Sequence, residues 1–211
     1  MKPFSESCEQ NKQVILDVIQ PLLSACHCLL EIGSGTGQHA VYFSQKMPHL
    51  QWQTSDRQSL LPGIQLWLDE YRQSSGNNIQ PAIALDVSRQ PWPQLSVDAI
   101  FSANTLHIMS DSEVVLFFKN IPAVLADNGL VMVYGPFNYQ AEYTSDSNRQ
   151  FDGWLKQRDP KSGIKDFETV NKLAGENGLK ILVDYDMPAN NRILLWQKET
   201  NQSGTGINNK Q

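Results

Sequence analysis

The sequence is poor in cysteine and in long apolar runs, and each shortage excludes something. Its 211 residues include three cysteines, an odd number without disulfide spacing, which favours a reducing compartment. No stretch approaches the roughly 18 apolar residues of a membrane span, and residues 1–9 lack the apolar run of a signal peptide. We therefore expect a cytoplasmic protein with no membrane partner.

Positive charge is also scarce. There are 17 Lys and Arg against 22 Asp and Glu, which gives a formal net charge of -5. A protein that neutralises many phosphates needs clustered Lys and Arg, and the sequence has no such cluster. We therefore expect no nucleic-acid partner and favour a small-molecule acceptor, while a protein substrate or an oligomer stays open.

A metal site is not expected either. Cys26, His27 and Cys28 are metal-ligand types, but in an extended strand the two cysteines share one face and His27 points to the other. A fourth ligand is missing as well. Two buried strand cysteines are the favoured interpretation.

What the sequence does contain is an alternation of strand and helix patterns, which we interpret as one domain over residues 1–198. Apolar strands are predicted at 27–32, 51–55, 79–85, 97–102 and 130–134. Helical periodicity is predicted at 11–23, 38–46, 59–73 and 111–126, the last with Asp111 as N-cap and Asn128-Gly129 as its stop.

The last third of the chain has a different character. Residues 137–165 are polar and aromatic with no clear period, which predicts a long functional loop that serves as a lid or as a wall of the substrate site. A helix at 166–177 and two strands at 180–185 and 192–197 follow; their short connection suits an antiparallel hairpin. Residues 199–211 are polar and glycine-rich, and we predict a disordered tail.

This alternation predicts an α/β fold, with a seven-stranded, mostly parallel sheet, helices on both faces and a C-terminal antiparallel hairpin. In such sheets ligands bind beyond the carboxyl ends of the strands. The residues at the predicted strand ends are therefore the candidates for a site.

A glycine-rich turn follows the first predicted strand. Gly33, Gly35 and Gly37 form G-x-G-x-G, which is one residue shorter than a dinucleotide fingerprint, and no P-loop Lys follows. Glu31 precedes the turn; an acid there suits a cationic ligand and would be unwelcome beside a pyrophosphate. Binding of NAD stays open as the alternative.

The pattern Glu-x-Gly-x-Gly-x-Gly after a first strand resembles motif I of the class I S-adenosylmethionine-dependent methyltransferases. The resemblance implies that Rossmann-like fold, with S-adenosylmethionine as the cofactor. It implies cofactor contacts from Glu31, Gly33, Ser34, Gly35 and Gly37, from Asp56 to the ribose hydroxyls, from Asp86 and Val87 to the adenine, and from Asn104 near the transferred methyl. Each aspartate alone would more often cap a helix.

Longer matches narrow the resemblance. The stretches 102–108, 134–137, 147–152 and 186–191 make the chain similar to the methyltransferase-like protein 26 family over about residues 9–197. Members of that family often have Arg before the Asn11-Lys12 pair, where this chain has Gln10. The family name implies activity by analogy and supplies no acceptor.

Three residues are candidates for the chemistry. His107 could be a general base at its ordinary pKa, or could cap a turn. Asn104 lies near the expected methyl position, and Tyr134 is a site wall or a packed aromatic. Asn104 does not begin the Asn/Asp-Pro-Pro-Tyr/Phe signature of amino-group methyltransferases, so that type of nitrogen chemistry is disfavoured.

Further polar groups could serve a substrate or merely hold the structure. In the 137–165 segment they are Tyr139, Tyr143, Asn148, Arg149, Asp152, Arg158 and Asp159; elsewhere they are His39, Asn190 and Asn191. Methyl transfer to a small molecule, at oxygen or nitrogen, is the leading hypothesis. The alternative is a non-catalytic protein that binds S-adenosylmethionine or a partner.

Overall fold

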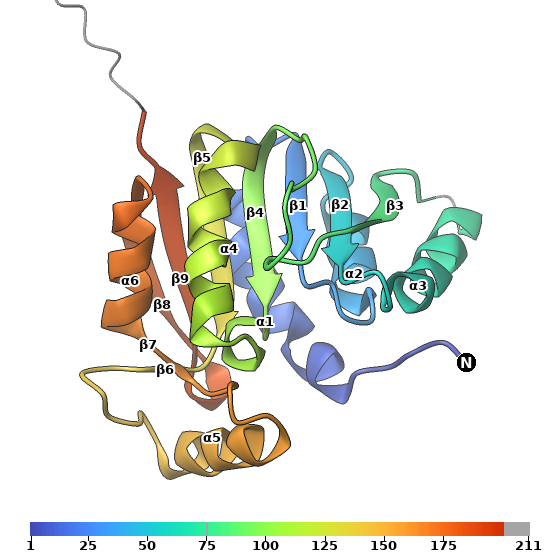
Figure 1. Cartoon of the computed structure of the whole chain (residues 1–211). Coiled ribbons are helices and arrows are strands. Elements are labelled where there is room, and N and C mark those ends of the chain that lie inside the picture. Colours follow the sequence, from blue (N-terminus) through green and yellow to red (C-terminus); the bar gives the residue numbers. More distant parts are fainter. Residues whose placement is uncertain (75, 201–211) are drawn as a thin grey trace, which may run out of the picture.

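A computed structural model describes residues 1–74 and 76–200 and shows a seven-stranded sheet between two layers of helices (Figure 1). The strand order is β3-β2-β1-β4-β5-β9-β8. The strands are β1 (Cys28–Ile32), β2 (Gln51–Asp56), β3 (Ile79–Ala84), β4 (Val97–Ala103), β5 (Leu125–Gly135), β8 (Leu179–Met187) and β9 (Asn191–Lys198). The pairs from β3 to β5 are parallel, and β9 runs antiparallel to both of its neighbours. The predicted α/β fold and closing hairpin are confirmed.

The helices cover both faces of the sheet. They are α1 (Glu6–Leu22), α2 (Gln38–Lys46), α3 (Leu61–Gln73), α4 (Asp111–Val124), α5 (Asp146–Arg158) and α6 (Phe167–Glu176). Alternate strand residues point to opposite faces. Leu29 and Phe101 thus pack with α1, α2 and α3, while Leu30 and Ile100 pack with α4 and α6. Burial on both faces explains why the central strands are nearly continuous apolar runs.

Two boundaries of α4 differ from the prediction. Its N-cap is Ser110 and not Asp111, because the Ser110 hydroxyl accepts the Glu113 N–H while the Glu113 carboxylate accepts the Ser110 N–H. The helix ends at Val124, before Asn128-Gly129, because Leu125 takes an extended conformation and pairs with Val97 of β4. Asn128, with φ +61°, lies inside β5.

The prediction of a long irregular loop over 137–165 is wrong. It contains the 13-residue helix α5, capped by the Ser145 hydroxyl, and two short strands, β6 (Phe137–Asn138) and β7 (Lys165–Asp166), that pair with each other. The cysteine prediction also needs correction: Cys26 is buried but precedes β1, and Cys28 is half-buried. Of the predicted tail, residues 201–211 lie outside the described residues.

The part of the chain that the structure describes contains no helix with the length and apolarity needed to cross a bilayer. In Figure 1, α5 lies beyond the carboxyl ends of β1, β2 and β4, at the same end of the sheet as the N-terminal segment. The short helices η1 (Leu106–Ile108) and η2 (Pro188–Asn190) complete the fold. Helix α5 and the N-terminal segment, far apart in the sequence, thus both lie at the end of the sheet where a ligand is expected.

Candidate functional site

A cavity opens at the carboxyl ends of the parallel strands. Its volume of about 800 Å³ is in the range of small-molecule sites. Of the eleven cofactor-binding and catalytic candidates, eight line it together: Gly33, Ser34, Gly35, Asp56, Asp86, Val87, Asn104 and His107. They come from the ends of β1 to β4 and the loops that follow. The topology therefore gathers residues that are more than 70 positions apart in the sequence.

The glycine turn is fastened to β2. The N–H groups of Gly33 and Ser34 both donate to the Ser55 carbonyl, at 3.0 Å each. Gly33 has φ +78°, and a Cβ there would lie 2.2 Å from Thr105 Cγ2. Only glycine allows both this left-handed conformation and this close approach.

Gly35 differs from Gly33 in what surrounds it. Its φ is +59°, and a Cβ there would have no heavy atom within 4 Å. Its N–H donates to Asp56 Oδ2 at 2.8 Å. Gly35 therefore exposes bare backbone to an open part of the cavity, next to a carboxylate.

Asp56 ends β2 and is only 8% exposed, yet it lines the cavity. Burial raises the pKa of this carboxyl, and hydrogen bonds from the Gly35 and Arg57 N–H groups oppose that rise. A carboxylate can accept about four hydrogen bonds. Asp56 accepts two from the backbone, so it retains the capacity to accept from a ligand.

Asp86 and Val87 follow β3 at the neighbouring part of the wall. The Asp86 carboxylate accepts the Ser88 hydroxyl at 2.6 Å and the Ser88 N–H at 3.0 Å. The Ser88 hydroxyl is the main reason why the pKa of Asp86 is lowered. Val87 is buried and gives this end of the cavity an apolar surface beside an ionised acid.

Asn104 and His107 lie on the loop after β4. Asn104 adopts φ +57°, and its N–H donates to the Tyr134 carbonyl at 2.9 Å. His107 is buried and forms an edge-to-face pair with the Phe151 ring, with 5.2 Å between the ring centroids. Burial, helped by the charge of Lys165, lowers the pKa of His107 to about 4. The expectation of an ordinary histidine pKa is therefore wrong, and the imidazole is neutral at pH 7.

The other three cofactor-binding and catalytic candidates do not line the cavity. Glu31 is buried behind the turn, where one carboxylate oxygen accepts the Ser34 hydroxyl at 2.8 Å and the Trp52 indole N–H at 3.1 Å. Gly37 is the N-cap of α2, with φ +90°, and a Cβ there would lie 3.2 Å from the Ile64 side chain. Tyr134 packs in the core on the α1 and α2 side of the sheet. Each of them supports the wall from behind.

Glu31 has an unusual titration as a result of its position. Burial raises its pKa to about 7, against the effect of the two donors. At the pH of a cell this side chain is thus divided between its neutral and ionised forms.

Several of the other polar groups named from the sequence do not line the cavity but hold the structure together. Asp152 is 2% exposed and holds α5 in place: it accepts the Ile164 N–H at 2.7 Å, the Tyr143 hydroxyl at 2.6 Å and Lys156 Nζ at 2.6 Å. The Asn148 amide donates to the Asn190 carbonyl at 3.1 Å, which ties the helix to the hairpin. These groups are a structural clamp.

Of the remaining polar groups named from the sequence, two have side-chain hydrogen-bond partners and two line the cavity. The Tyr139 hydroxyl donates to Asp184 at 2.7 Å. His39 lines the cavity and bonds Asn11 Oδ1 at 2.7 Å through Nε2. Arg158 lines the cavity from the last turn of α5.

The sequence reasoning missed part of the wall. Phe151, Trp154 and Leu155 of α5, Ile108 of η1 and several residues of the N-terminal segment face the cavity. The N-terminal segment is held by the Trp67 indole N–H, which donates to the Pro3 carbonyl at 2.7 Å. The spacing 151, 154, 155 and 158, one face of a helix, could have revealed the α5 stripe. Over residues 1–74 and 76–200 no cluster of His, Cys, Asp or Glu could hold a metal ion.

This sheet order, with a cavity at the carboxyl ends of β1 to β4 and an antiparallel closing hairpin, defines the class I methyltransferase fold. Within that class, the chain belongs to the family described as a protein of unknown function, DUF938, whose model matches residues 2–198.

Solved structures share the fold. An O-methyltransferase family protein from Burkholderia thailandensis matches with a TM-score of 0.80 at 10% identity, over 93% of this chain and 59% of that chain. Human N-acetylserotonin methyltransferase, in complex with S-adenosylmethionine, matches with a TM-score of 0.74 at 16% identity, over 92% and 53% of the two chains. The S-adenosylmethionine-dependent methyltransferase SibL, in its apo form, matches with a TM-score of 0.77 at 18% identity, over 92% of this chain and 56% of that chain. The chain thus spans little more than half the length of these proteins.

Proposed function

We propose that this chain is an S-adenosylmethionine-dependent methyltransferase that acts on a small molecule at oxygen or nitrogen. The observation that carries the proposal is Asp56: a buried carboxylate at the end of β2 that faces the cavity beside Gly35 and retains accepting capacity. A vicinal diol such as that of a ribose donates two hydrogen bonds and fits this acceptor. The motif matches favour the methyltransferase-like protein 26 group, with residues 1–198 acting as one domain.

The remaining cofactor contacts follow from the cavity wall. Asp86 and Val87 would hold the adenine, through the carboxylate and the apolar side chain. Gly33, Ser34 and Gly35 would accommodate the methionine part, with Asn104 beside the methyl. Glu31 and Gly37 would act indirectly by fixing the turn. When bound, S-adenosylmethionine supplies a methyl group on a sulfonium, which an acceptor atom takes by displacement, leaving S-adenosylhomocysteine and releasing a proton.

The residues near the methyl would act mainly by positioning, which can supply much of the catalysis of such a displacement. His107, neutral at pH 7, can accept a hydrogen bond from the acceptor. Its lowered pKa makes it a weak general base. Tyr134 supports Asn104 through its backbone carbonyl, so we assign it a structural role.

Titration calorimetry with S-adenosylmethionine, S-adenosylhomocysteine and NAD tests this proposal. We expect both sulfur compounds to bind and NAD not to bind. Asp56→Ala should weaken binding at least about tenfold, because hydrogen bonds to a charged group contribute about 1.5–3 kcal/mol. The matched control is Asp69→Ala, an exposed carboxylate on α3.

Two outcomes would overturn the proposal. Tighter binding of NAD would indicate an oxidoreductase, and failure of both sulfur compounds to bind a folded protein would remove the site. Transfer itself is tested by following S-adenosylhomocysteine formation with a small-molecule extract of cells. Binding without any turnover would indicate a non-catalytic protein.

A further inference from the structure

Helix α5 presents an apolar stripe that does not enter either core cluster. Phe151, Trp154, Leu155 and Arg158 lie at positions i, i+3, i+4 and i+7, on one face of the helix, and all four line the cavity. Leu155 is buried, but Trp154 is 48% exposed. The Phe151 and Trp154 rings stack with centroids 5.8 Å apart. A flat aromatic surface therefore forms the cavity wall on this helix.

The loop after β4 adds another apolar part of the wall. Ile108 is 55% exposed although it lines the cavity, and the buried Met109 follows it. Two hydrogen bonds join this loop to the segment that follows α5: the Gly163 N–H donates to the His107 carbonyl at 2.9 Å, and the Ser162 hydroxyl donates to the Ile108 carbonyl at 3.1 Å. Apolar groups left exposed inside a cavity are typical of a ligand site.

This apolar region contains one cation. The Arg158 guanidinium lies 4.5 Å above the Trp154 ring. No ion pair joins it to a carboxylate among residues 1–74 and 76–200, whereas Arg57, the other arginine of the wall, pairs with Glu113 at 2.8 Å. The acids that line the cavity, Asp56 and Asp86, belong to the proposed cofactor region. Arg158 is exposed to solvent beside these apolar groups, and the planar fork of a guanidinium pairs with planar anions such as carboxylates.

We propose that the methyl acceptor is a flat, apolar molecule that carries a carboxylate, bound between the α5 stripe and Ile108 with its acid on Arg158. This inference rests on the proposed methyltransferase function. His107 lies beside Phe151, so an acceptor in this region has its reactive atom near the loop that carries Asn104. Arg158 and Trp154 are thus assigned to acceptor binding and specificity.

Calorimetry with 2-naphthoate and its neutral analogue 2-naphthamide, each in saturating S-adenosylhomocysteine, tests the inference. We expect 2-naphthoate to bind more tightly than the amide. Arg158→Gln should weaken the binding of 2-naphthoate about tenfold and leave the binding of 2-naphthamide unchanged, because the substitution removes only the charge-assisted hydrogen bonds. Trp154→Ala should weaken both compounds.

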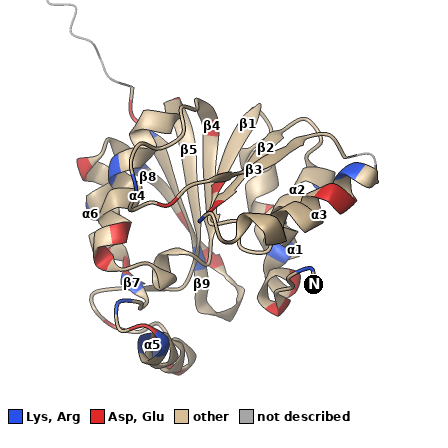
Figure 2. Cartoon of the chain, turned by 45° about the vertical axis from the view of Figure 1, so that its right-hand side comes forward, with Lys and Arg blue, Asp and Glu red and all other residues tan. Residues whose placement is uncertain are grey.

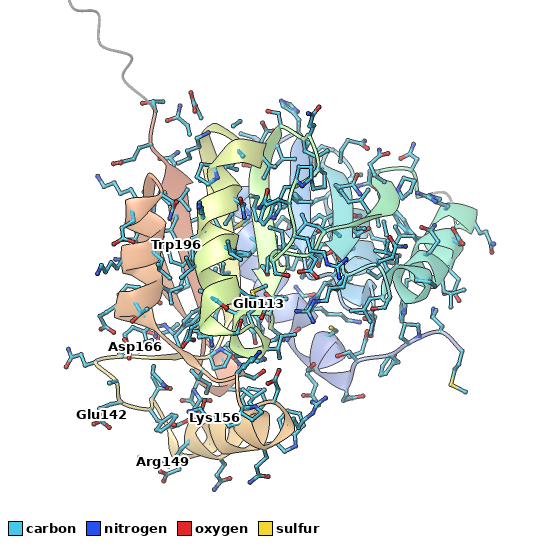
Figure 3. The ribbon with its side chains drawn as sticks, in the orientation of Figure 1. Glu113, Glu142, Arg149, Lys156, Asp166 and Trp196 are labelled. Atoms are coloured by element: carbon cyan, nitrogen blue, oxygen red, sulfur yellow. The ribbon has the colours of Figure 1, made fainter. Side chains whose placement is uncertain are left out.

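Arg149→Gln is the matched control. Arg149 lies on the same helix, is largely exposed and points away from the sheet in Figure 3, so neither compound should be affected. Equal binding of acid and amide, no effect of Arg158→Gln, or no binding of either compound would overturn the inference. S-adenosylhomocysteine binding, measured first in the same samples, separates this failure from a failure of the proposed function.

Discussion

At the scale of single residues, the glycine turn offers a matched pair of substitutions. Gly33→Ala should destabilise the fold by roughly 3 kcal/mol, because it combines left-handed strain with overlap on Thr105. Gly35→Ala should cost only about 1 kcal/mol, since its methyl meets open space. Urea unfolding measures both. Equal losses would mean that Thr105 simply moves aside.

The same pair tests the cofactor site. The Gly35 methyl would project into the space assigned to the cofactor, so Gly35→Ala should weaken S-adenosylmethionine binding despite its smaller effect on stability. Calorimetry at a temperature where both variants are folded gives the answer. Unchanged affinity would move the cofactor away from this turn.

Glu31 supplies a pH prediction. Its folded-state pKa of about 7 exceeds the unfolded value of about 4.5, so the folded state binds the proton more tightly and this contribution to stability is lost as the pH rises between those values. Glu31→Gln removes the loss. The stability of the variant relative to the wild type should therefore increase by about 2–3 kcal/mol between pH 5 and pH 8.

The free energy of unfolding must be measured for both the wild type and Glu31→Gln, because other groups also change stability with pH. His39 and His107, whose pKa values burial lowers to about 4, contribute the opposite slope, and they cancel because both proteins contain them. Denaturant unfolding at several pH values is the measurement. A difference that stays constant with pH would show that Glu31 titrates normally.

The sequence order was enough to predict which residues lie together where their signal is local. Asp56 ends a strand, and Asp86 and Asn104 come directly after the end of one or within two residues of it. Parallel strands bring their carboxyl ends to one edge of the sheet. The position of Glu31 behind the wall could not be predicted. It depends on Trp52, which reaches Glu31 from the neighbouring strand, a contact that no spacing encodes.

At the scale of elements, α5 depends on one buried carboxylate. Asp152→Asn should loosen the helix, because an amide cannot accept from all three donors that Asp152 holds. We expect amide hydrogen exchange over residues 146–164 to accelerate by about tenfold, with the central strands unchanged. Asp146→Asn, at an exposed position on the same helix, should have no effect. Uniform acceleration of the whole chain would instead make α5 part of the global unfolding unit.

The failure to predict α5 has a physical reason. Helix prediction relies on an apolar stripe that faces a core. The α5 stripe is short and faces a cavity, and Gly153, a poor helix former, lies between its two aromatic residues in the sequence. The other helices cover the sheet, so their periodicity was visible. The α4 boundary was misjudged because Asn128-Gly129 has a turn composition but lies within β5.

At the scale of the whole molecule, the fold was predictable because strand and helix patterns alternate and parallel sheets follow from that order. The wall that we propose for the acceptor was predicted only as a functional loop over residues 137–165, since its helix lies outside this alternation. The charge of the molecule, by contrast, can be read from the sequence. The positions of Lys and Arg alternate with those of Asp and Glu along the ribbon in Figure 2, and the net charge is -5.

This charge distribution gives the last prediction, that the acceptor is not a nucleic acid. Binding of a labelled 20-nucleotide RNA, measured by fluorescence anisotropy at about 150 mM salt, should be weaker than about 100 µM, the weak end of non-specific binding. Polyanions need several clustered cations, and the cavity wall offers two arginines, one of them paired with Glu113. Micromolar binding that falls steeply with salt would contradict this and would favour RNA as the substrate. Weak binding at every salt concentration, together with acid-dependent binding of 2-naphthoate, would assign the Arg158 cation to a small carboxylate.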